Sequence, residues 1–204
     1  MFYLNAINIK GFLFMQLQPN QGFNGKFFNI VMGKDYYKAP NGAEVSLKKG
    51  TGKVEYSDNG VLKVSDADKV VIIGTNGNDK ILVRNSFITY IAPKLGDNKT
   101  LIDNCKFKKF NTFWGIGSRI VTGGGLFSSY KKGSDKIQIN GNFDGAIFAQ
   151  QGSGTAWGSD KKAHKDEILI KGNHNGYITV DTGDKVAVKG EKDGRIVNVS
   201  EIII

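Results

Sequence analysis

The chain has 204 residues, 40% of them hydrophobic, with 27 glycines and only three prolines, a composition that excludes a disordered chain and indicates one folded, turn-rich β domain. The formal net charge of +9 favours polyanionic partners without choosing among them. A single cysteine, Cys105, excludes both an intramolecular disulfide and a cysteine-rich metal site.

Residues 1–60 lack the repeat that dominates the rest of the chain. Their first half is rich in aromatic and aliphatic residues and is broken at Pro19-Asn20. A loop is predicted at Tyr36–Gly42, followed by strands at Glu44–Leu47 and Lys53–Tyr56. Because an open end of stacked strands would expose core side chains and strand edges, we expect residues 1–60 to form an N-terminal β cap or a small subdomain.

Residues 61–204 are expected to form a second, repeat-containing β domain. Short apolar runs bounded by glycine and polar turns predict strands at Val61–Val64, Val70–Ile73, Ile81–Val83, Phe87–Ile91, Leu101–Ile102 and Phe107–Phe110. The repeat has the form Asp, then Lys or Glu, then apolar-x-apolar, which gives a strand with one apolar face. It begins at Asp166 and Asp184, and similar units begin upstream at Asp79, Asp97 and Asp135.

The intervals between these copies suggest a fixed period with insertions. Asp79 and Asp97 are 18 residues apart, as are Asp166 and Asp184. The 38 residues from Asp97 to Asp135 are interpreted as two periods with two residues over. The 31 residues from Asp135 to Asp166 are one period plus an insertion at 153–165. This pattern is typical of stacked repeat proteins, in which no unit has a core of its own.

The fold class expected from this pattern is all-β: a parallel β-solenoid, of β-helix or β-roll type, with about 18 residues per coil. The alternative is an antiparallel meander, sandwich or barrel. Tyr177–Val180, Val186–Val188 and Ile196–Val199 also fit adjacent antiparallel strands, with hairpin signals at Asn175-Gly176 and Asp193-Gly194.

Three turn sequences resemble the second half of the calcium-binding nonapeptide of RTX β-rolls: Gly77-Asn78-Asp79-Lys80-Ile81, Gly133-Ser134-Asp135-Lys136-Ile137 and Gly183-Asp184-Lys185-Val186. The resemblance implies calcium as a cofactor. Turn aspartates could bind the ion through side-chain and nearby carbonyl oxygens, and the candidates are Asp79, Asp135, Asp166 and Asp184. The alternative is that each aspartate accepts hydrogen bonds from its own turn.

Residues 81–87 and 101–107 look like successive coils of a pectate-lyase-type right-handed β-helix, with Asn85 and Asn104 in equivalent places. In those enzymes an arginine or lysine is the base of a β-elimination that calcium assists. Arg84, Arg119 and Asp103 are of the types that the resemblance requires. No spacing in the sequence selects these residues, so no catalytic residue is assigned. Whether the protein is an enzyme stays open; if it is one, a polysaccharide lyase or a glycosidase is expected.

Basic residues cluster in two stretches, and an inserted loop on a repeat scaffold is a common place for binding residues. On this basis the candidate ligand-binding residues are Lys106, Lys108, Lys109, Arg119, Lys131, Lys132 and, in the insertion, Trp157. Phe107 and Phe110 are expected in the core. His164 and His174 are expected to be solvated loop residues.

The first hypothesis is that the protein binds an acidic polysaccharide. In one version of this hypothesis it also cleaves the polysaccharide by β-elimination. A non-enzymatic adhesin or virulence effector that binds a host surface protein is the second hypothesis, and an RTX-like calcium module the third. Nucleic acid is a weaker candidate, because no exposed aromatic residues are expected among the lysines. Oligomeric state is left open.

The expected location is outside the cell or on its surface. The start of the chain lacks a basic leader and a cleavage site, which argues against a Sec signal, and no apolar run is long enough for a transmembrane helix. Ser200–Ile204, an acidic residue before three isoleucines, is similar to the terminal signal of type I export substrates. A cytoplasmic location stays open.

Overall fold

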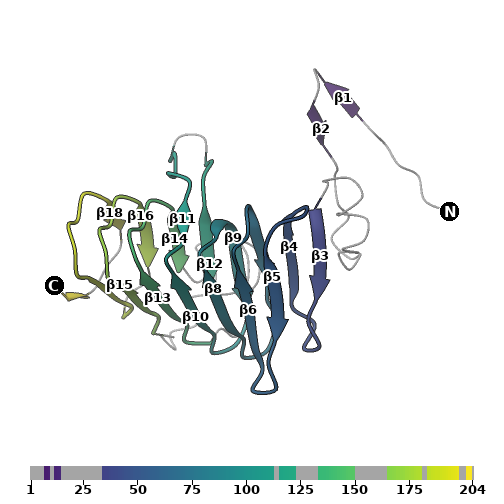
Figure 1. The fold of residues 1–204 in the computed structure, drawn as a ribbon. Helices are drawn as coiled ribbons and strands as arrows, with labels where there is room; N and C mark the ends of the chain where they lie inside the picture. The colour runs from purple at the N-terminus through teal and green to yellow at the C-terminus, as the bar shows by residue number, and fades with distance from the viewer. Residues whose placement is uncertain are drawn as a thin grey trace.

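The computed structural model describes residues 7–9, 12–14, 34–112, 115–122, 133–149, 165–180, 183–197 and 201–203. Within these residues the chain forms β-strands and turns and no helix, so none of them supplies a helix that could cross a membrane. Strands β1 (Ile7–Ile9) and β2 (Phe12–Phe14) form a small antiparallel hairpin, and the other strands build two larger sheets (Figure 1). The prediction of an all-β protein is confirmed.

The eight-stranded sheet contains, in spatial order, β5 (Lys53–Tyr56), β6 (Val61–Ser65), β8 (Lys80–Arg84), β10 (Lys99–Asp103), β13 (Lys136–Asn140), β15 (Glu167–Ile170), β17 (Lys185–Val188) and β19 (Glu201–Ile203). The nine-stranded sheet contains β3 (Lys34–Lys38), β4 (Glu44–Lys48), β7 (Val70–Ile73), β9 (Phe87–Lys94), β12 (Arg119–Thr122), β14 (Ala146–Ala149), β16 (Tyr177–Val180) and β18 (Arg195–Val197), with the short β11 (Lys106–Phe107) beside β9.

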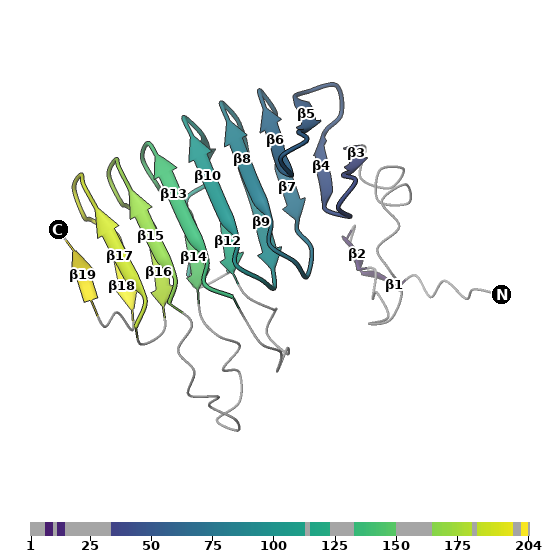
Figure 2. The same ribbon diagram turned by 90° about the horizontal axis from the view of Figure 1, so that it is seen from below.

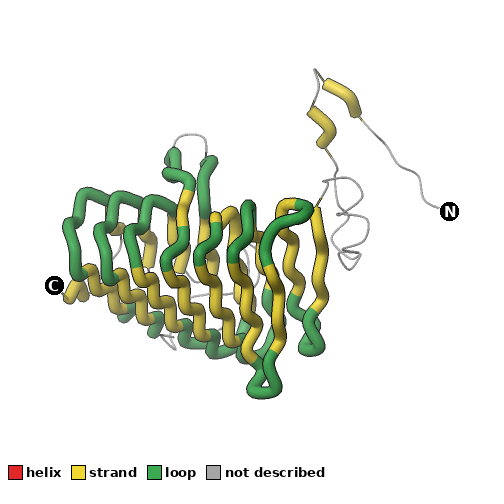
Figure 3. Tube along the Cα trace, in the orientation of Figure 1, coloured by secondary structure: helices red, strands yellow, loops and turns green. Residues whose placement is uncertain are grey.

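From β6 onward the chain alternates between the two sheets. Successive strands within each sheet pair in parallel, β6 with β8, β8 with β10 and so on to β19. One circuit of the chain therefore adds one strand to each sheet, and Figure 2 shows the circuits side by side in sequence order. Turns and loops join the sheets at the corners (Figure 3). The core lies between the two sheets.

Alternate residues of each strand point into this core. In β8, Ile81 and Val83 are buried while Lys80 and Arg84 are exposed. Their in-register partners in the next strands are Thr100 and Ile102, Ile137 and Ile139, Ile168 and Ile170, and Val186 and Val188. β-branched side chains pack well on a pleated surface, and each fully buried valine or isoleucine contributes about 1.5–3 kcal/mol.

The circuits do not keep the spacing that the sequence suggested between Asp97 and Asp135. Asn98, rather than Asp97, stacks on Asp79, because Lys99 pairs with Lys80 at a separation of 19 residues. β10 then pairs directly with β13, Lys99 opposite Lys136. The interpretation as two periods was therefore wrong: this is one circuit, enlarged after β11 and again after β12.

Before β6 the pairing changes direction. β3 pairs with β4, β4 with β7, and β5 with β6, all antiparallel. These strands extend the two sheets within the range where a cap was expected. The predicted loop at Tyr36–Gly42 was wrong in its first part, because Tyr36 and Tyr37 belong to β3 and lie opposite Ser46 and Val45.

The described residues between 177 and 197 do not form an antiparallel meander. β16 pairs with β18 in parallel, Ile178 opposite Ile196. The expected hairpin turn at Asp193-Gly194 is instead a stacked corner, in which the Gly194 N–H donates to the carbonyl of His174, 20 residues earlier, at 2.7 Å. Glycine and asparagine fit either kind of turn, so local composition could not separate the two.

Candidate functional site

A column of polar side chains runs along one buried corner. It contains Asp79, Asn98, Asp135, Asp166 and Asp184, one from each circuit, and none is more than 7% exposed. Each backbone N–H donates to the Oδ1 atom of the next member, at 2.8 Å for Asp79, 3.0 Å for Asn98, 2.8 Å for Asp135 and 2.8 Å for Asp166. We call this the carboxylate column. It satisfies buried backbone donors that the turn leaves without a strand partner.

Burial sets the electrostatics of the column. It raises the pKa of Asp166 to about 7; the N–H of Asp135 acts in the opposite direction, and the charges of Asp135 and Asp184 add to the rise. Burial also raises the pKa of Asp79, against hydrogen bonds from Thr75 and the charge of Lys94. Stacked carboxyl groups this close hold protons more tightly than isolated ones.

The four aspartates predicted as calcium ligands are therefore together, in one column. The residue after each aspartate, such as Lys80 or Lys136, points outward and is exposed. Calcium needs six to eight oxygen ligands around one point. Here Oδ1 atoms of Asp135, Asp166 and Asp184 accept backbone N–H groups, and the described residues contain no group of three acidic, histidine or cysteine side chains that could hold a metal. The arrangement does not fit a calcium site, and no step below depends on calcium.

The outer face of the eight-stranded sheet carries a row of lysines. Lys80, Lys99 and Lys136 lie directly opposite one another on neighbouring strands, and Lys185 follows after Glu167. All four lysines are exposed. Neighbouring strands are about 4.8 Å apart, and the Lys136 Nζ lies 2.7 Å from a Glu167 carboxylate oxygen. We call Lys80, Lys99, Lys136 and Lys185 the lysine row.

Next to the lysine row lies an apolar row on the same outer face. Leu82, Leu101 and Leu169 occupy equivalent positions two residues further along their strands, with Gln138 between the last two. Each of these leucines is half-buried. We call these three the leucine row. They form a narrow apolar strip on a face that is mostly polar elsewhere.

Further basic groups border the leucine row on its other side. Arg84 Nε lies 3.5 Å from Asp103 on the neighbouring strand, and Lys171 and Lys189 are exposed just after β15 and β17. Between β6 and β17 this outer face presents two acidic residues, Asp103 and Glu167, and the basic residues Lys63, Lys80, Arg84, Lys99, Lys136, Lys171, Lys185 and Lys189.

The lysines predicted to bind ligand lie elsewhere. Lys106, Lys108 and Lys109 are exposed on and after β11, and Arg119 begins β12; all belong to the nine-stranded sheet. Lys131, Lys132 and Trp157 lie outside the described residues, as does the insertion 153–165 except for Lys165. Of the residues suggested by the lyase resemblance, Arg84 and Asp103 form an ion pair, and Arg119 is on the other sheet.

An aromatic cluster covers part of the nine-stranded sheet from outside. The Phe110 ring centroid lies 5.6 Å from that of Phe148 and 6.1 Å from that of Tyr177, and the Arg119 guanidinium carbon is 5.7 Å from it. Ala146, in the strand that carries Phe148, is fully buried. Phe107 is in the core as predicted, but placing Phe110 there was wrong: it packs on the outer face of the sheet.

The prediction that His174 is a solvated loop residue was wrong. It is fully buried, and its ring stacks on Phe143 with centroids 5.9 Å apart. Burial lowers its pKa, against the backbone of Arg195 and the charge of Asp144. A histidine whose ring is stacked between circuits is a packing residue. His164 lies outside the described residues.

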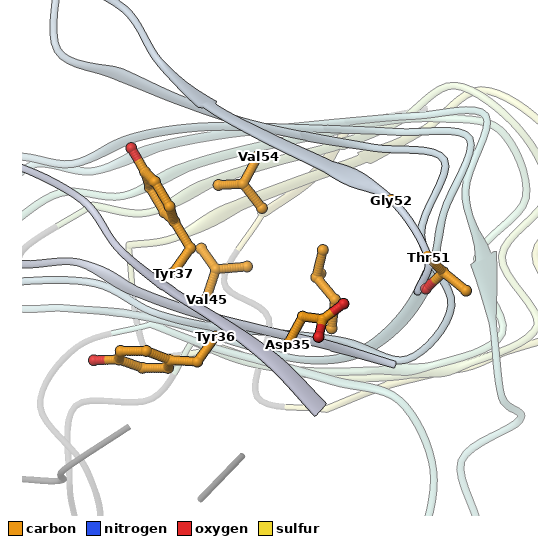
Figure 4. A pocket seen from close by; sticks show the side chains of 8 residues that line it. Asp35, Tyr36, Tyr37, Val45, Thr51, Gly52 and Val54 are labelled. Carbon is orange, nitrogen blue, oxygen red and sulfur yellow. The ribbon is translucent and has the colours of Figure 1, made fainter. Parts of the chain in front are cut away.

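A pocket of about 160 Å³ lies near the N-terminal end of the two sheets (Figure 4). It is lined by Asp35, Tyr36, Tyr37, Val45, Leu47, Thr51, Gly52 and Val54. Asp35, its one charged residue, already accepts the Gly50 N–H at 2.8 Å. The pocket brings together no set of acids, bases or nucleophiles.

The sequence contains a signal for the lysine row that the predicted ligand-binding residues did not include. Lys80, Lys136 and Lys185 directly follow the aspartates of the repeat, and adjacent strand residues face opposite ways. A buried aspartate therefore implies an exposed lysine. Lys99 was hidden because the repeat there was aligned on Asp97 instead of Asn98.

Comparisons of the chain with protein-family models, curated proteins and solved structures gave no match. The proposal below therefore rests on the chain's own residues.

Proposed function

We propose that this protein is a secreted or surface-exposed β-solenoid, closed at its N-terminal end by antiparallel strands, that binds a linear acidic polysaccharide along the outer face of its eight-stranded sheet. The observation that carries the proposal is the lysine row, with Lys80, Lys99 and Lys136 in register on consecutive strands.

The lysine row favours a polyanion because its charges repel one another. Two unit charges at the strand spacing interact by up to about 1 kcal/mol in water. Placing Lys80, Lys99 and Lys136 opposite one another is unfavourable for folding, as like charges across strands generally are. An anionic chain lying across the strands would contact these lysines in succession and remove the repulsion.

The leucine row favours a polysaccharide over nucleic acid. Sugar rings have apolar C–H faces that can rest on Leu82, Leu101 and Leu169 while acidic groups reach the lysines. Single-stranded nucleic acid is bound through aromatic side chains on which bases stack. The described outward residues of β6 to β17 in this sheet include no aromatic side chain.

The solenoid and the location are part of the same proposal. Parallel strands that alternate between two sheets from β6 to β19 support a solenoid. A polysaccharide ligand places the binding function outside the cytoplasm. The resemblance to β-helix lyases supports a carbohydrate ligand, and no catalytic residue is assigned.

The test is binding of a polyuronate by isothermal titration calorimetry, with a neutral polysaccharide as the ligand control. Lys80→Glu/Lys99→Glu should weaken binding at least tenfold. Lys38→Glu/Lys49→Glu, the same charge change at exposed lysines outside this face, should change it less than threefold. Wild-type binding should weaken steeply with added salt.

Equal affinity of the two double variants, or indifference of the wild type to acidic and neutral chains, would reject this site and favour the protein-binding hypothesis. Ultraviolet absorbance of the incubated polymer answers a separate question. A rise would show unsaturated products and hence lyase activity at the bound chain.

A further inference from the structure

The lysine row begins at a definite place. The residue in register with Lys80 on β6 is Val61, which is apolar and half-buried. The Lys80 Nζ donates to the carbonyl of Asn59, in the turn that precedes β6, at 3.4 Å. Strand β6 therefore does not continue the row, and Lys80 is its first member.

An acidic residue interrupts the row after its third lysine. Glu167 on β15 lies directly opposite Lys136 on one side and Lys185 on the other. Its carboxylate is 2.7 Å from the Lys136 Nζ, and both side chains of this pair are more than half exposed. An anionic chain that crosses the strands in the order shown in Figure 2, starting at Lys80, therefore meets three lysines and then a carboxylate.

The leucine row is interrupted at nearly the same place. Leu82 and Leu101 lie on β8 and β10, but the residue in register with them on β13 is Gln138. Leu169 follows on β15, the strand that carries Glu167. A lysine of the one row and a leucine of the other therefore occur together only on β8 and β10.

Cross-strand pairing alone does not explain this order of charges. Opposite charges on neighbouring strands attract and like charges repel, so an order that served only stability would alternate them. Here Lys80, Lys99 and Lys136 are consecutive, and one acid then pairs with the last of them. This order fits a polyanion that lies over the three lysines and is repelled where it reaches Glu167.

We propose that Glu167 limits the length of acidic polysaccharide that the outer face binds, because it ends the uninterrupted run of lysines at Lys136. The inference rests on the proposed function and adds that the site is short. From Lys80 to Lys136 there are two strand spacings, about 10 Å, and a sugar in an extended chain has about the length of one spacing. The site therefore takes about three acidic sugars. Without the charge of Glu167 the row would continue to Lys185, over about 19 Å.

The test compares the trimer and the hexamer of 1,4-linked mannuronate, measured by competition with a fluorescein-labelled polymannuronate. In wild-type protein the hexamer should bind at most about fourfold tighter than the trimer, which is the number of ways in which six sugars can place three on the site. Glu167→Gln removes the charge and keeps the shape of the side chain. It should raise this ratio about fivefold, the effect of one further charge contact at the strand spacing in water.

Asp68→Asn is the matched control. Asp68, between β6 and β7, forms an ion pair with Lys48 at 3.2 Å, and both side chains are about as exposed as those of Lys136 and Glu167. This variant also removes one carboxylate from an exposed ion pair, but not from the lysine row. It should leave the ratio of hexamer to trimer affinity as in wild type. Thermal unfolding checks that both variants are folded.

The outcomes separate this inference from the proposed function. If wild-type protein binds neither the oligomers nor polymannuronate, the proposed function fails and the inference fails with it. If wild-type protein binds them but Glu167→Gln leaves the ratio unchanged, the polysaccharide site stands and only the inference is overturned. A wild-type ratio that already reaches about twentyfold would also overturn it, because the bound chain would then extend past Glu167, toward Lys171 and Lys189.

Discussion

The carboxylate column and the lysine row are built from adjacent residues of the same repeat, yet they lie in opposite environments. Asp135 is 2% exposed and accepts a backbone N–H, whereas Lys136 faces solvent and pairs with Glu167. In both, like groups stack at the strand spacing. In the carboxylate column, bound protons and hydrogen bonds reduce the repulsion between neighbouring carboxylates. In the lysine row, water and salt screen the repulsion between neighbouring ammonium groups.

Because of this difference, the buried aspartates of the repeat support the fold, whereas its exposed lysines are the residues to which our proposal assigns binding. A buried side chain that accepts a backbone N–H is difficult to replace by one that has no acceptor. An exposed lysine can be replaced without harm to the fold, so its presence in register is better explained by a ligand. The following predictions test the contrast from the largest expected effect to the smallest.

Asp135→Ala should lower the free energy of unfolding by about 2 kcal/mol, because it leaves the Asn98 N–H buried without an acceptor. Lys136→Ala, one residue away, should change it by less than about 0.5 kcal/mol, since its ion pair is exposed. Urea unfolding of both variants measures the difference. Equal effects would remove the distinction between column and row.

Asp166 should make the protein less stable as the pH rises. Its folded pKa of about 7 lies above the ordinary value of 3.8, so the folded state binds the proton more tightly. The contribution is fully present below pH 3.8 and is lost as the pH passes through about 7. Its size is on the order of 4 kcal/mol.

Asp166→Asn is the matched variant, since Asn98 shows that an amide fits the column and can accept the same bond. At pH 8 it should be more stable than wild type, and at pH 4 the advantage should vanish. Unfolding free energies at the two pH values decide this. An advantage that is the same at both would mean that Asp166 titrates normally.

Lys99→Glu should separate stability from binding. It replaces repulsion from Lys80 and Lys136 by attraction, so the unfolding free energy should rise slightly, by up to about 0.5 kcal/mol and less in high salt. Polyuronate binding should weaken in the same variant. A loss of both would indicate that Lys99 acts through the fold.

Chelation should have the smallest effect. Because backbone hydrogen bonds hold the carboxylate column, the protein should unfold at the same temperature, within about 1 °C, with calcium or with EDTA. A ligand that binds only the folded state, present at a concentration of a hundred times its Kd, would add about 2.7 kcal/mol to the free energy of unfolding. A fall of several degrees on chelation would therefore restore the calcium hypothesis for Asp79, Asp135, Asp166 and Asp184.

Much of the strand pattern followed from local sequence. Lys53–Tyr56, Val70–Ile73 and Tyr177–Val180 were predicted with the bounds that the structure shows. The orientation of Ile168 and Ile170 toward the core was also readable, because strand side chains alternate. The candidate site was only partly accessible: the aspartates were grouped correctly, but the lysines that follow them were not recognised as a row.

The sequence by itself determined that this is a β protein and which face of most strands is apolar, since both depend on residues within one strand. Only the tertiary structure decided which strands pair. It set Asn98 rather than Asp97 above Asp79, packed Phe110 against Phe148, and buried His174 against Phe143. A shift of one residue in the register between circuits leaves the apolar pattern within each strand unchanged but gives every residue different cross-strand neighbours. The register is therefore set by packing between segments that are distant in the sequence.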